Sequence, residues 1–239
     1  MEGLSETLPR VALSTSLGTI ILGIDAAAAP ITAQNFLEYV RRGVFDQTAF
    51  YRVAAPCNQV AETTRIDVIQ GGLNEDLQPP FPPVAHEPTY RTGLTHCDGA
   101  LSMARRSVGS AAGAFFICIG DQPELDHGGR RHPDGQGFAA FGQVLEGMEV
   151  VRAIWERAET GLFLSCPVPI ISAVVLETEW GSSDPEAEFA PAVLRHGGAN
   201  ALATGMTTPS PKSPGRETSK ANKHPDETHW ERVIDRATD

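Results

Sequence analysis

Three short segments of the sequence place polar side chains directly beside apolar ones, and a fourth short segment is wholly apolar. Arginine and glutamine side chains donate hydrogen bonds, and phenylalanine offers a large apolar surface. The chain contains no motif of a phosphate-binding loop, a dinucleotide-binding loop, a serine hydrolase or a zinc protease. The pattern therefore favours non-covalent chemistry over a nucleophile. The segments are Phe50-Tyr51-Arg52-Val53, Ile69-Gln70-Gly71-Gly72, Leu101-Ser102-Met103-Ala104 and Phe115-Phe116-Ile117.

Two histidines raise the question of a metal. His127 and His132 flank Gly128-Gly129-Arg130-Arg131 in a segment rich in glycine and proline. A metal site would need two more ligands that the fold places nearby. A solvated polar loop is the simpler interpretation, and we predict neither a metal nor a cofactor.

Short strands are the elements that must position these segments. Val11–Ser14 and Thr19–Ile24 flank Ser16-Leu17-Gly18 and predict a hairpin. A parallel sheet would need a helix between most strands, so the pattern predicts a closed or sandwich-like β architecture. Further strands are expected at Ala49–Ala54, Val68–Gly71, Ala100–Ala104, Phe115–Ile119, Phe138–Val144 and Ile170–Trp180.

Two segments have helical periodicity. Pro30 precedes Thr32, which we expect to be the N-cap of a helix that ends at Gly43. The apolar residues between Phe36 and Val40 recur at helical spacing within it. Glu146–Ala158 has the second clear helical period.

Composition excludes several classes of protein. The 239 residues carry a formal net charge of -11, which opposes binding to nucleic acid. No apolar run is long enough to span a membrane, and Met1–Arg10 lacks the pattern of a signal peptide. The four cysteines form no C-x-x-C pair and are interpreted as reduced thiols. We expect a monomeric cytoplasmic protein, or a periplasmic one if the true start lies upstream and includes a signal peptide.

The charge pattern divides the chain into two parts. Residues 1–180 contain 21 acidic and 12 basic residues, and all 12 basic residues are arginine. From Gly181 onward the chain is rich in Pro, Ser, Thr, Ala, Gly and Asn. Such a composition cannot bury enough surface to offset its ordering entropy. We predict one domain over 1–180 and a flexible, disordered extension over 181–239.

Taken singly, Arg52 would be interpreted as a surface arginine and Phe115-Phe116 as strand core. Their occurrence together with Gln70, in one order along the chain, favours a functional role instead. The sequence resembles the cyclophilin family of peptidyl-prolyl cis-trans isomerases, which reads F-H-R-V, I-Q-G-G, G-x-x-S-M-A and S-Q-F-F-I. Ala140–Val151 (AFGQVLEGMEVV) matches a further family segment. The resemblance runs from about Val11 to Trp180. It implies a mainly β fold, a closed eight-stranded antiparallel barrel capped by two α-helices, with a substrate groove on its outer surface.

The resemblance also implies two catalytic residues. Rotation about an X–Pro amide loses resonance over a barrier of about 18–20 kcal/mol. A catalyst can lower it by offering a hydrogen-bond donor to the prolyl nitrogen, which becomes an acceptor only when conjugation is broken. Arginine suits this role because it is permanently charged. By resemblance Arg52 is the donor, and Gln70 orients the substrate carbonyl or the guanidinium.

The remaining expected contacts are with a proline-containing polypeptide, which is the partner that the resemblance implies. Some would form the pocket for the proline ring, and Ala104 and Arg105 fall where the family binds substrate backbone. Phe138 stands where a histidine is usual and keeps an apolar wall. The expected substrate-binding residues are Val68, Ala104, Arg105, Phe116, Leu125 and Phe138.

The sequence departs from the family pattern in two segments and at two positions. Seventeen residues separate Arg52 from Gln70, and the extra polar stretch Ala55–Arg65 is expected to bulge at one end of the groove. Asp126–Gly137 is an enlarged loop containing Arg130 and Arg131, which could contact an acidic peptide or be solvated, and solvation is favoured. Asp67 stands where an aromatic pocket residue is usual, and Ala114 replaces a Gln or Glu.

Two hypotheses about function follow. The first is an active isomerase that assists the folding of proline-containing chains. The second, motivated by Asp67 and Ala114, is a catalytically weak or inactive module that binds proline peptides. Arg52 favours the enzyme, because binding alone has less use for a transition-state donor.

Overall fold

The computed structural model describes residues 8–60, 64–74 and 78–176. The predicted extension 181–239 and the predicted strand residues 177–180 lie outside them. Within the described part of the chain, every helix is too short or too polar to cross a membrane.

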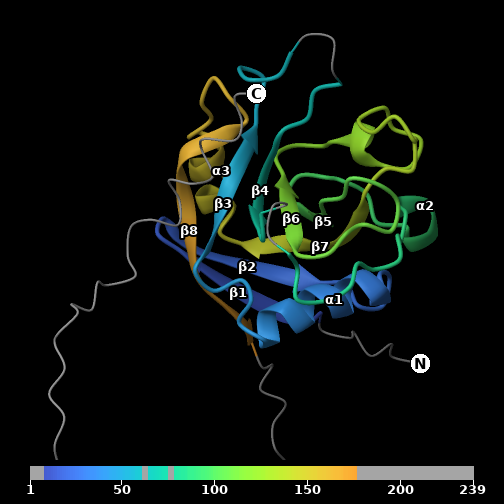
Figure 1. Cartoon of the computed structure of the whole chain (residues 1–239), viewed down its shortest axis with the longest axis horizontal. Coiled ribbons are helices and arrows are strands. Elements are labelled where there is room, and N and C mark those ends of the chain that lie inside the picture. The colour runs from blue at the N-terminus through green and yellow to red at the C-terminus, as the bar shows by residue number, and fades with distance from the viewer. Residues whose placement is uncertain (1–7, 61–63, 75–77, 177–239) are drawn as a thin grey trace, which may run out of the picture. The chain divides into compact units, whose positions relative to one another are not determined.

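The described residues form a closed antiparallel barrel of eight strands in the order β1-β2-β7-β5-β6-β4-β3-β8 (Figure 1). The predicted fold class is therefore confirmed, and β1 and β2 form the predicted hairpin, with Thr15 opposite Gly18. The strands are β1 (Arg10–Thr15), β2 (Gly18–Ile24), β3 (Thr48–Ala54), β4 (Val68–Gly72), β5 (Ala100–Met103), β6 (Ala114–Cys118), β7 (Ala139–Glu146) and β8 (Phe163–Leu176).

Strand β8 begins well before its predicted first residue. We predicted this strand from Ile170, whereas it begins at Phe163, which lies opposite Arg52 of β3. Pro167 and Pro169 lie in this first half. Proline cannot donate to a strand ladder and weakens the sequence signal for a strand, although Pro169 is accommodated here opposite Ala49.

Aromatic rings fill the barrel. Phe36 contacts three other rings with centroids 5.1–5.3 Å apart, and one of these, to Phe115, is edge-to-face. These residues are almost completely buried, and burial of such large apolar side chains is the main favourable term in folding. The interlocking rings are Phe36, Phe45, Phe50, Phe115 and Phe141.

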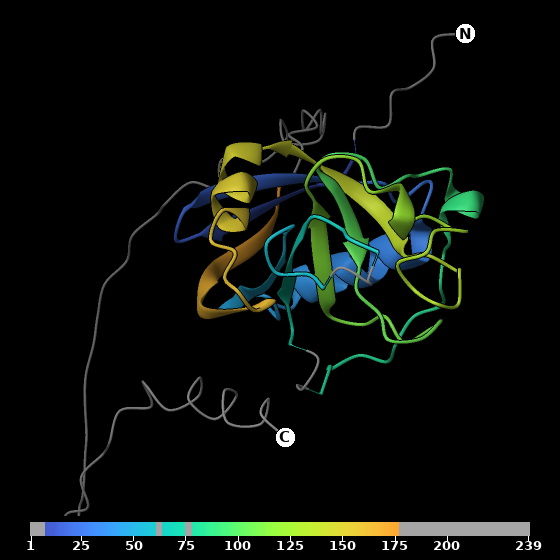
Figure 2. The same ribbon diagram turned by 90° about the horizontal axis from the view of Figure 1, so that it is seen from above.

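Two helices, α1 (Pro30–Arg41) and α3 (Met148–Trp155), pack on this core at separate ends of the barrel (Figures 1 and 2). Both were predicted, whereas the single turns α2 (Thr89–Thr92) and η1 (Pro123–Leu125) were not. Helix α3 follows Gly147, whose φ is +89°. A Cβ on that residue would lie 2.5 Å from the Thr19 carbonyl oxygen, so the close approach to β2 requires glycine.

The predicted cap of α1 is wrong. The helix begins at Pro30, so Thr32 lies inside its first turn. Its first free N–H groups are satisfied from a distant segment: Glu87 accepts hydrogen bonds from the backbone N–H of Ile31 (3.2 Å), the backbone N–H of Thr32 (2.7 Å) and the Thr32 hydroxyl (2.6 Å). Proline at the first helical position has no N–H to satisfy, and the buried carboxylate replaces a local cap.

Glu87→Ala is expected to lower the free energy of unfolding by about 2 kcal/mol, because it leaves buried N–H groups without an acceptor. Urea denaturation of the purified chain measures this. Glu38→Ala is the matched control, since Glu38 pairs only with Arg42 at the surface of the same helix, and it should cost less than about 0.5 kcal/mol. Equal effects of the two substitutions would contradict the capping role.

Candidate active site

Four neighbouring strands place one row of side chains side by side on the outside of the barrel. Arg52 of β3 is the register partner of Gln70 of β4, Gln70 of Phe116 on β6, and Phe116 of Ser102 on β5. Because side chains alternate between the faces of a strand, the side chains that flank Gln70, Phe116 and Ser102 in sequence point into the core. The predicted Arg52, Gln70 and Phe116 are therefore brought together on one outer face.

A chain of hydrogen bonds holds the polar end of this row. Nη1 of Arg52 donates to Oε1 of Gln70 at 2.8 Å, and Nε2 of Gln70 donates to the Tyr51 hydroxyl at 3.0 Å. Gln70 is 4% exposed, so its amide has few alternative orientations. The amide is neutral, so it orients the guanidinium and leaves its positive charge in place.

Tyr51 is a site residue that the sequence did not reveal. Consecutive strand residues normally face opposite sides, yet Tyr51 and Arg52 both reach Gln70. The register of β3 shifts between Phe50 and Arg52, and such an irregularity re-aims side chains. The Tyr51 ring also stacks on Phe163 at 6.4 Å. No local sequence signal marks this bulge.

The apolar end of the row lies in a second hydrophobic cluster outside the barrel. Phe116 and Phe138 meet edge-to-face with centroids 5.5 Å apart, and Val68 and Leu125 are buried beside them. Ala104 lies at the edge of the same cluster. The structure thus brings together the predicted apolar residues. The buried members are Ala54, Ile66, Val68, Ala100, Phe116, Cys118 and Leu125.

Ile66 rather than Asp67 contributes to this cluster. We expected Asp67 to remove part of the pocket wall, but the neighbouring Ile66 is 5% exposed and packs in the cluster instead. One carboxylate oxygen of Asp67 is buried and has no hydrogen-bond partner among the described residues. Burial raises the pKa of Asp67 above its ordinary value, because desolvation disfavours the charged form.

A buried triad of polar groups supports Phe116 from below. The His96 ring stacks on Phe116 with centroids 5.9 Å apart. Its Nδ1 lies 2.7 Å from a carboxylate oxygen of Asp126, and its Nε2 lies 2.9 Å from the Ser102 hydroxyl. Ser102 is 0% exposed, so this serine cannot reach a substrate as a nucleophile. The triad is a scaffold, and the sequence analysis did not identify it.

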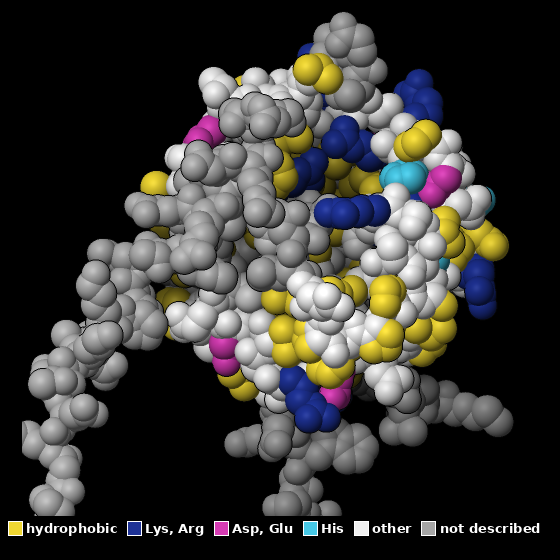
Figure 3. All heavy atoms as spheres, in the orientation of Figure 1, with side chains coloured by type: hydrophobic (Ala, Val, Ile, Leu, Met, Phe, Trp, Pro, Cys, Tyr) yellow, Lys and Arg dark blue, Asp and Glu magenta, His cyan; other side chains and the backbone are white. Residues whose placement is uncertain are grey.

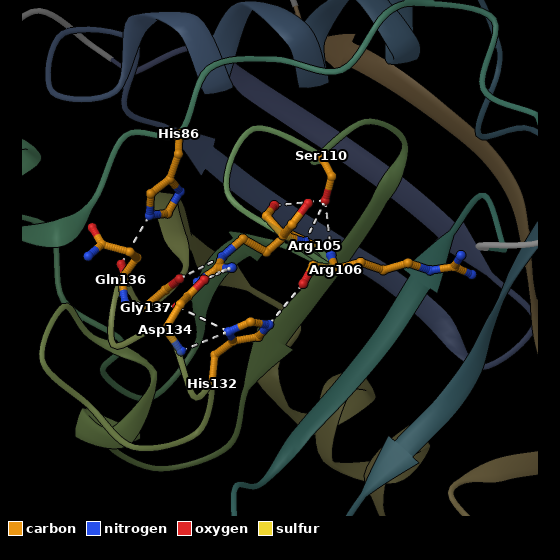
Figure 4. A network of polar contacts seen from close by, with 9 residues as sticks. His86, Arg105, Arg106, Ser110, His132, Asp134, Gln136 and Gly137 are labelled. Carbon is orange, nitrogen blue, oxygen red and sulfur yellow. Dashed lines mark hydrogen bonds and ion pairs between the residues drawn. The ribbon is translucent and has the colours of Figure 1, made fainter.

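Arg105 points away from the groove into the Asp126–Gly137 loop (Figure 4). Its side chain is 1% exposed, and Nη1 and Nη2 donate to the two carboxylate oxygens of Asp134 at 2.7 and 2.8 Å. Nε donates to the Gly137 carbonyl at 2.8 Å, and the guanidinium lies 5.1 Å from the Phe138 ring centroid. The Arg105 side chain therefore positions Phe138, and only its backbone is left to bind substrate. This pairing holds the pKa of Asp134 below its ordinary value.

The two histidines of this loop have separate partners. His132 contacts Asp134 at 3.0 Å and the Arg106 carbonyl at 2.9 Å (Figure 4). His127 instead packs against Tyr90, with ring centroids 4.5 Å apart and the ring planes tilted by 55°. No group of three or more His, Cys, Asp and Glu residues within the described ranges could hold a metal ion.

A cavity of about 210 Å³ adjoins the row on the side of β6. Its lining includes Leu73 after β4, Arg106 and Ser110 between β5 and β6, and the alanines Ala104 and Ala114. The Arg106 side chain extends away from the loop network (Figure 4). In Figure 3 the face shown is hollowed, with hydrophobic side chains at the floor and Lys or Arg side chains around the rim.

The amino-acid sequence is similar to those of known proteins of one family. Residues 10–175 match the family model described as cyclophilin type peptidyl-prolyl cis-trans isomerase/CLD. Peptidyl-prolyl cis-trans isomerase A of Dickeya dadantii is 38% identical over 151 residues, which cover 62% of this chain and 72% of that protein. A peptidyl-prolyl cis-trans isomerase of Streptomyces antibioticus is also 38% identical over 151 residues, covering 62% and 83%.

Solved structures share the fold. A cyclophilin-type isomerase of Cryptosporidium parvum, crystallised in the presence of the dipeptide Ala-Pro, superposes with a TM-score of 0.57 at 18% identity. The match covers 71% of this chain and 99% of that one.

Asp134→Ala is expected to lower the free energy of unfolding at pH 7 by about 3 kcal/mol, because it leaves Arg105 buried without its carboxylate. The folded-state pKa of Asp134 is depressed, so this stabilisation is complete above the ordinary pKa near 4 and is lost as the pH falls further. The stability gap between the wild type and the variant, measured by urea denaturation, should therefore narrow between pH 7 and pH 3.

Glu124→Gln is the control for this prediction. It breaks the pair with Arg130, whose side chain is 79% exposed, and should change stability little, because solvent screens an exposed pair. A gap between wild type and Asp134→Ala that does not depend on pH would contradict the electrostatic role of Asp134.

Asp67→Asn is expected to stabilise the protein, in contrast to Asp134→Ala. It removes a partly buried carboxylate and should raise the free energy of unfolding at pH 7 by about 0.5 kcal/mol. Because the pKa of Asp67 is raised, its buried negative charge destabilises the wild type above the folded-state pKa. Below the ordinary pKa near 4 the group is protonated in both states, and this cost is absent. Urea denaturation at pH 7 and pH 3 should show the gain only at pH 7, and a loss of stability at pH 7 would contradict it.

Proposed function

The chain belongs to the family of cyclophilin-type peptidyl-prolyl cis-trans isomerases, and from that premise we propose that it accelerates rotation about X–Pro bonds. Its substrates are proline-containing polypeptides, whose folding it assists. The Ala-Pro dipeptide used with the Cryptosporidium relative supports this class of substrate. Cytoplasmic location, a monomeric state and the lack of nucleic-acid and membrane partners stay predictions from the sequence.

Selective stabilisation of the twisted amide is the basis of the proposed catalysis. In the planar amide the prolyl nitrogen shares its electron pair with the carbonyl group. When rotation breaks the conjugation, this pair becomes an acceptor, so a donor placed there binds the transition state and not the ground state. Stabilisation by about 7 kcal/mol corresponds to an acceleration of about 10^5-fold.

The observation that carries the proposal is the 2.8 Å hydrogen bond from Arg52 Nη1 to Gln70 Oε1 beside an apolar pocket. A guanidinium has five N–H donors in a rigid fork, so one donor fixes its orientation while another serves the prolyl nitrogen. Gln70 is the positioning residue in this scheme. Because the amide is uncharged, the hydrogen bond to Gln70 aligns the guanidinium without itself neutralising it.

The proline ring is held by the apolar cluster. Phe116 and Phe138 meet edge-to-face in this cluster, and the fully buried Leu125 packs in it and supports them. An apolar ring gains free energy by leaving water for such a pocket, and its grip sets the proline nitrogen near Arg52. The backbone of Ala104, at the edge of the cluster, serves the extended polypeptide.

A second candidate function is a module that binds proline peptides with little or no catalysis. Ala114 favours it, since the methyl side chain in the lining of the cavity offers no hydrogen bond to a polypeptide. Arg52 favours catalysis, because a binding pocket alone gains little from a cation at the prolyl nitrogen.

Arg52→Ala is expected to lower the catalysed cis/trans exchange rate of Ala-Pro peptides at least tenfold, because the transition-state donor is lost. NMR exchange measurements at low temperature, with both proteins shown to be folded, test this. Arg130→Ala is the matched control, since Arg130 is an exposed arginine that pairs with Glu124, and it should keep the wild-type rate. If the wild type shifts peptide resonances without speeding exchange, the chain is a binding module.

A further inference from the structure

The enlarged loop Asp126–Gly137 carries two adjacent arginines in different surroundings. Arg130 is 79% exposed and pairs with Glu124, Nη2 to Oε1, at 2.7 Å. Arg131 is half-buried, and its Nη1 donates to the Thr64 carbonyl at 2.7 Å and to Oε1 of Gln59 at 3.5 Å. Solvation, the outcome favoured from the sequence, therefore describes Arg130 better than Arg131.

Arg131 retains a positive charge that its hydrogen bonds do not neutralise. The guanidinium donates to two neutral acceptors, a backbone carbonyl and a side-chain amide. Within residues 8–60, 64–74 and 78–176 no carboxylate forms an ion pair with it. Burial lowers the pKa of Arg131, although an arginine stays protonated at physiological pH. By contrast, Arg105 and Arg152 each have an aspartate partner at 2.7 Å. A partly desolvated cation of this kind favours an incoming anion.

Arg131 is connected to two walls of the apolar pocket. Oε1 of Gln59, which it contacts, also accepts a hydrogen bond from the Ile66 N–H at 3.1 Å, and Ile66 packs in the pocket cluster. The Arg131 backbone N–H donates to the Glu124 carbonyl at 3.1 Å, one residue before the buried Leu125. The guanidinium therefore lies where the two enlarged segments of the chain meet at one end of the groove.

We propose that Arg131 determines substrate specificity by binding the carboxylate of an Asp or Glu side chain close to the X–Pro bond. Among the described contacts only Nη1 of the guanidinium is engaged. Nε and Nη2 remain for the bidentate pairing that arginine makes with carboxylates. This inference rests on the proposed function, since it names the class of polypeptide that the same groove prefers.

The overall charge of the protein makes such local recognition necessary. A formal net charge of -11 repels an acidic polypeptide at long range. At physiological ionic strength this repulsion is screened beyond about 8 Å, so a cation in direct contact with the carboxylate decides the preference. A partly buried pair is screened less than exposed charges are.

A matched peptide series tests the proposal. Each pair carries Glu or Gln at one position, from three residues before the proline to three residues after it, and kcat/KM is measured by NMR exchange. The wild type should prefer Glu about fivefold at one or two adjacent positions on one side of the proline. Arg131→Gln should reduce that ratio to about one, Arg131→Lys should retain part of it, and Arg130→Gln should leave it unchanged.

Several outcomes would overturn the proposal. These are equal rates for Glu and Gln peptides with the wild type, a preference that survives in Arg131→Gln, or a preference lost equally in Arg130→Gln. If Arg131→Gln does not fold, the wild-type ratio decides: raising the salt concentration to about 0.5 M should bring it towards one, and a ratio independent of salt contradicts the proposal.

Binding separates this inference from the isomerase proposal. If no peptide is isomerised, NMR titration gives the Kd of the same Glu and Gln peptides. Tighter binding of the Glu peptide that is lost in Arg131→Gln supports the role of Arg131 while the isomerase proposal fails. Equal Kd values for the Glu and Gln peptides contradict the role of Arg131. If the protein accelerates exchange of the Gln peptides alone, the isomerase proposal stays intact.

Discussion

Closure of the barrel is the constraint on which the rest of the structure depends. In a closed sheet every strand is hydrogen-bonded on both sides, and alternate side chains must fill the interior. The rings of Phe50 and Phe115 meet this demand, at 5.8 Å from each other. Phe116, the neighbour of Phe115, is thereby directed outward, and the register shift between Phe50 and Arg52 brings Arg52 to the same face. The register with Gln70 places Arg52 and Phe116 in one row. The site is therefore a consequence of how the core is packed.

The outward row becomes a pocket only because loops cover part of it. An apolar cluster on the outside of a barrel would be exposed to water if the barrel stood alone. Ile66 and Leu125 come from segments between strands and bury that cluster. Their positions depend on polar contacts: Gln59 holds the backbone of Ile66 on both its N–H and its carbonyl, and Asp134 holds Arg105 beneath Phe138. The pocket is thus formed by apolar contacts and fastened by hydrogen bonds.

Periodicity explains how much of this could be predicted from the sequence. Alternation within strands indicated a closed or sandwich-like β architecture. The resemblance to the cyclophilin family, carried by the order of the segments, implied the closed barrel and the site residues Arg52, Gln70 and Phe116. Features that depend on distant partners were not predictable. Glu87 caps a helix that begins 57 residues earlier in the chain, and a shift in strand register brings Tyr51 to Gln70. Neither leaves a local pattern, because each arises only when segments far apart in the sequence meet.

The partner of each arginine decides what that arginine can do. A carboxylate neutralises Arg105 and fixes it, so its side chain supports the pocket from within the loop. The amide of Gln70 aligns Arg52 without cancelling its charge, and a backbone carbonyl does the same for Arg131. Residue type alone does not separate these cases, since a guanidinium is charged in all three. In a domain whose bases are all arginine, the acceptors around a guanidinium therefore say more about its role than the residue type does.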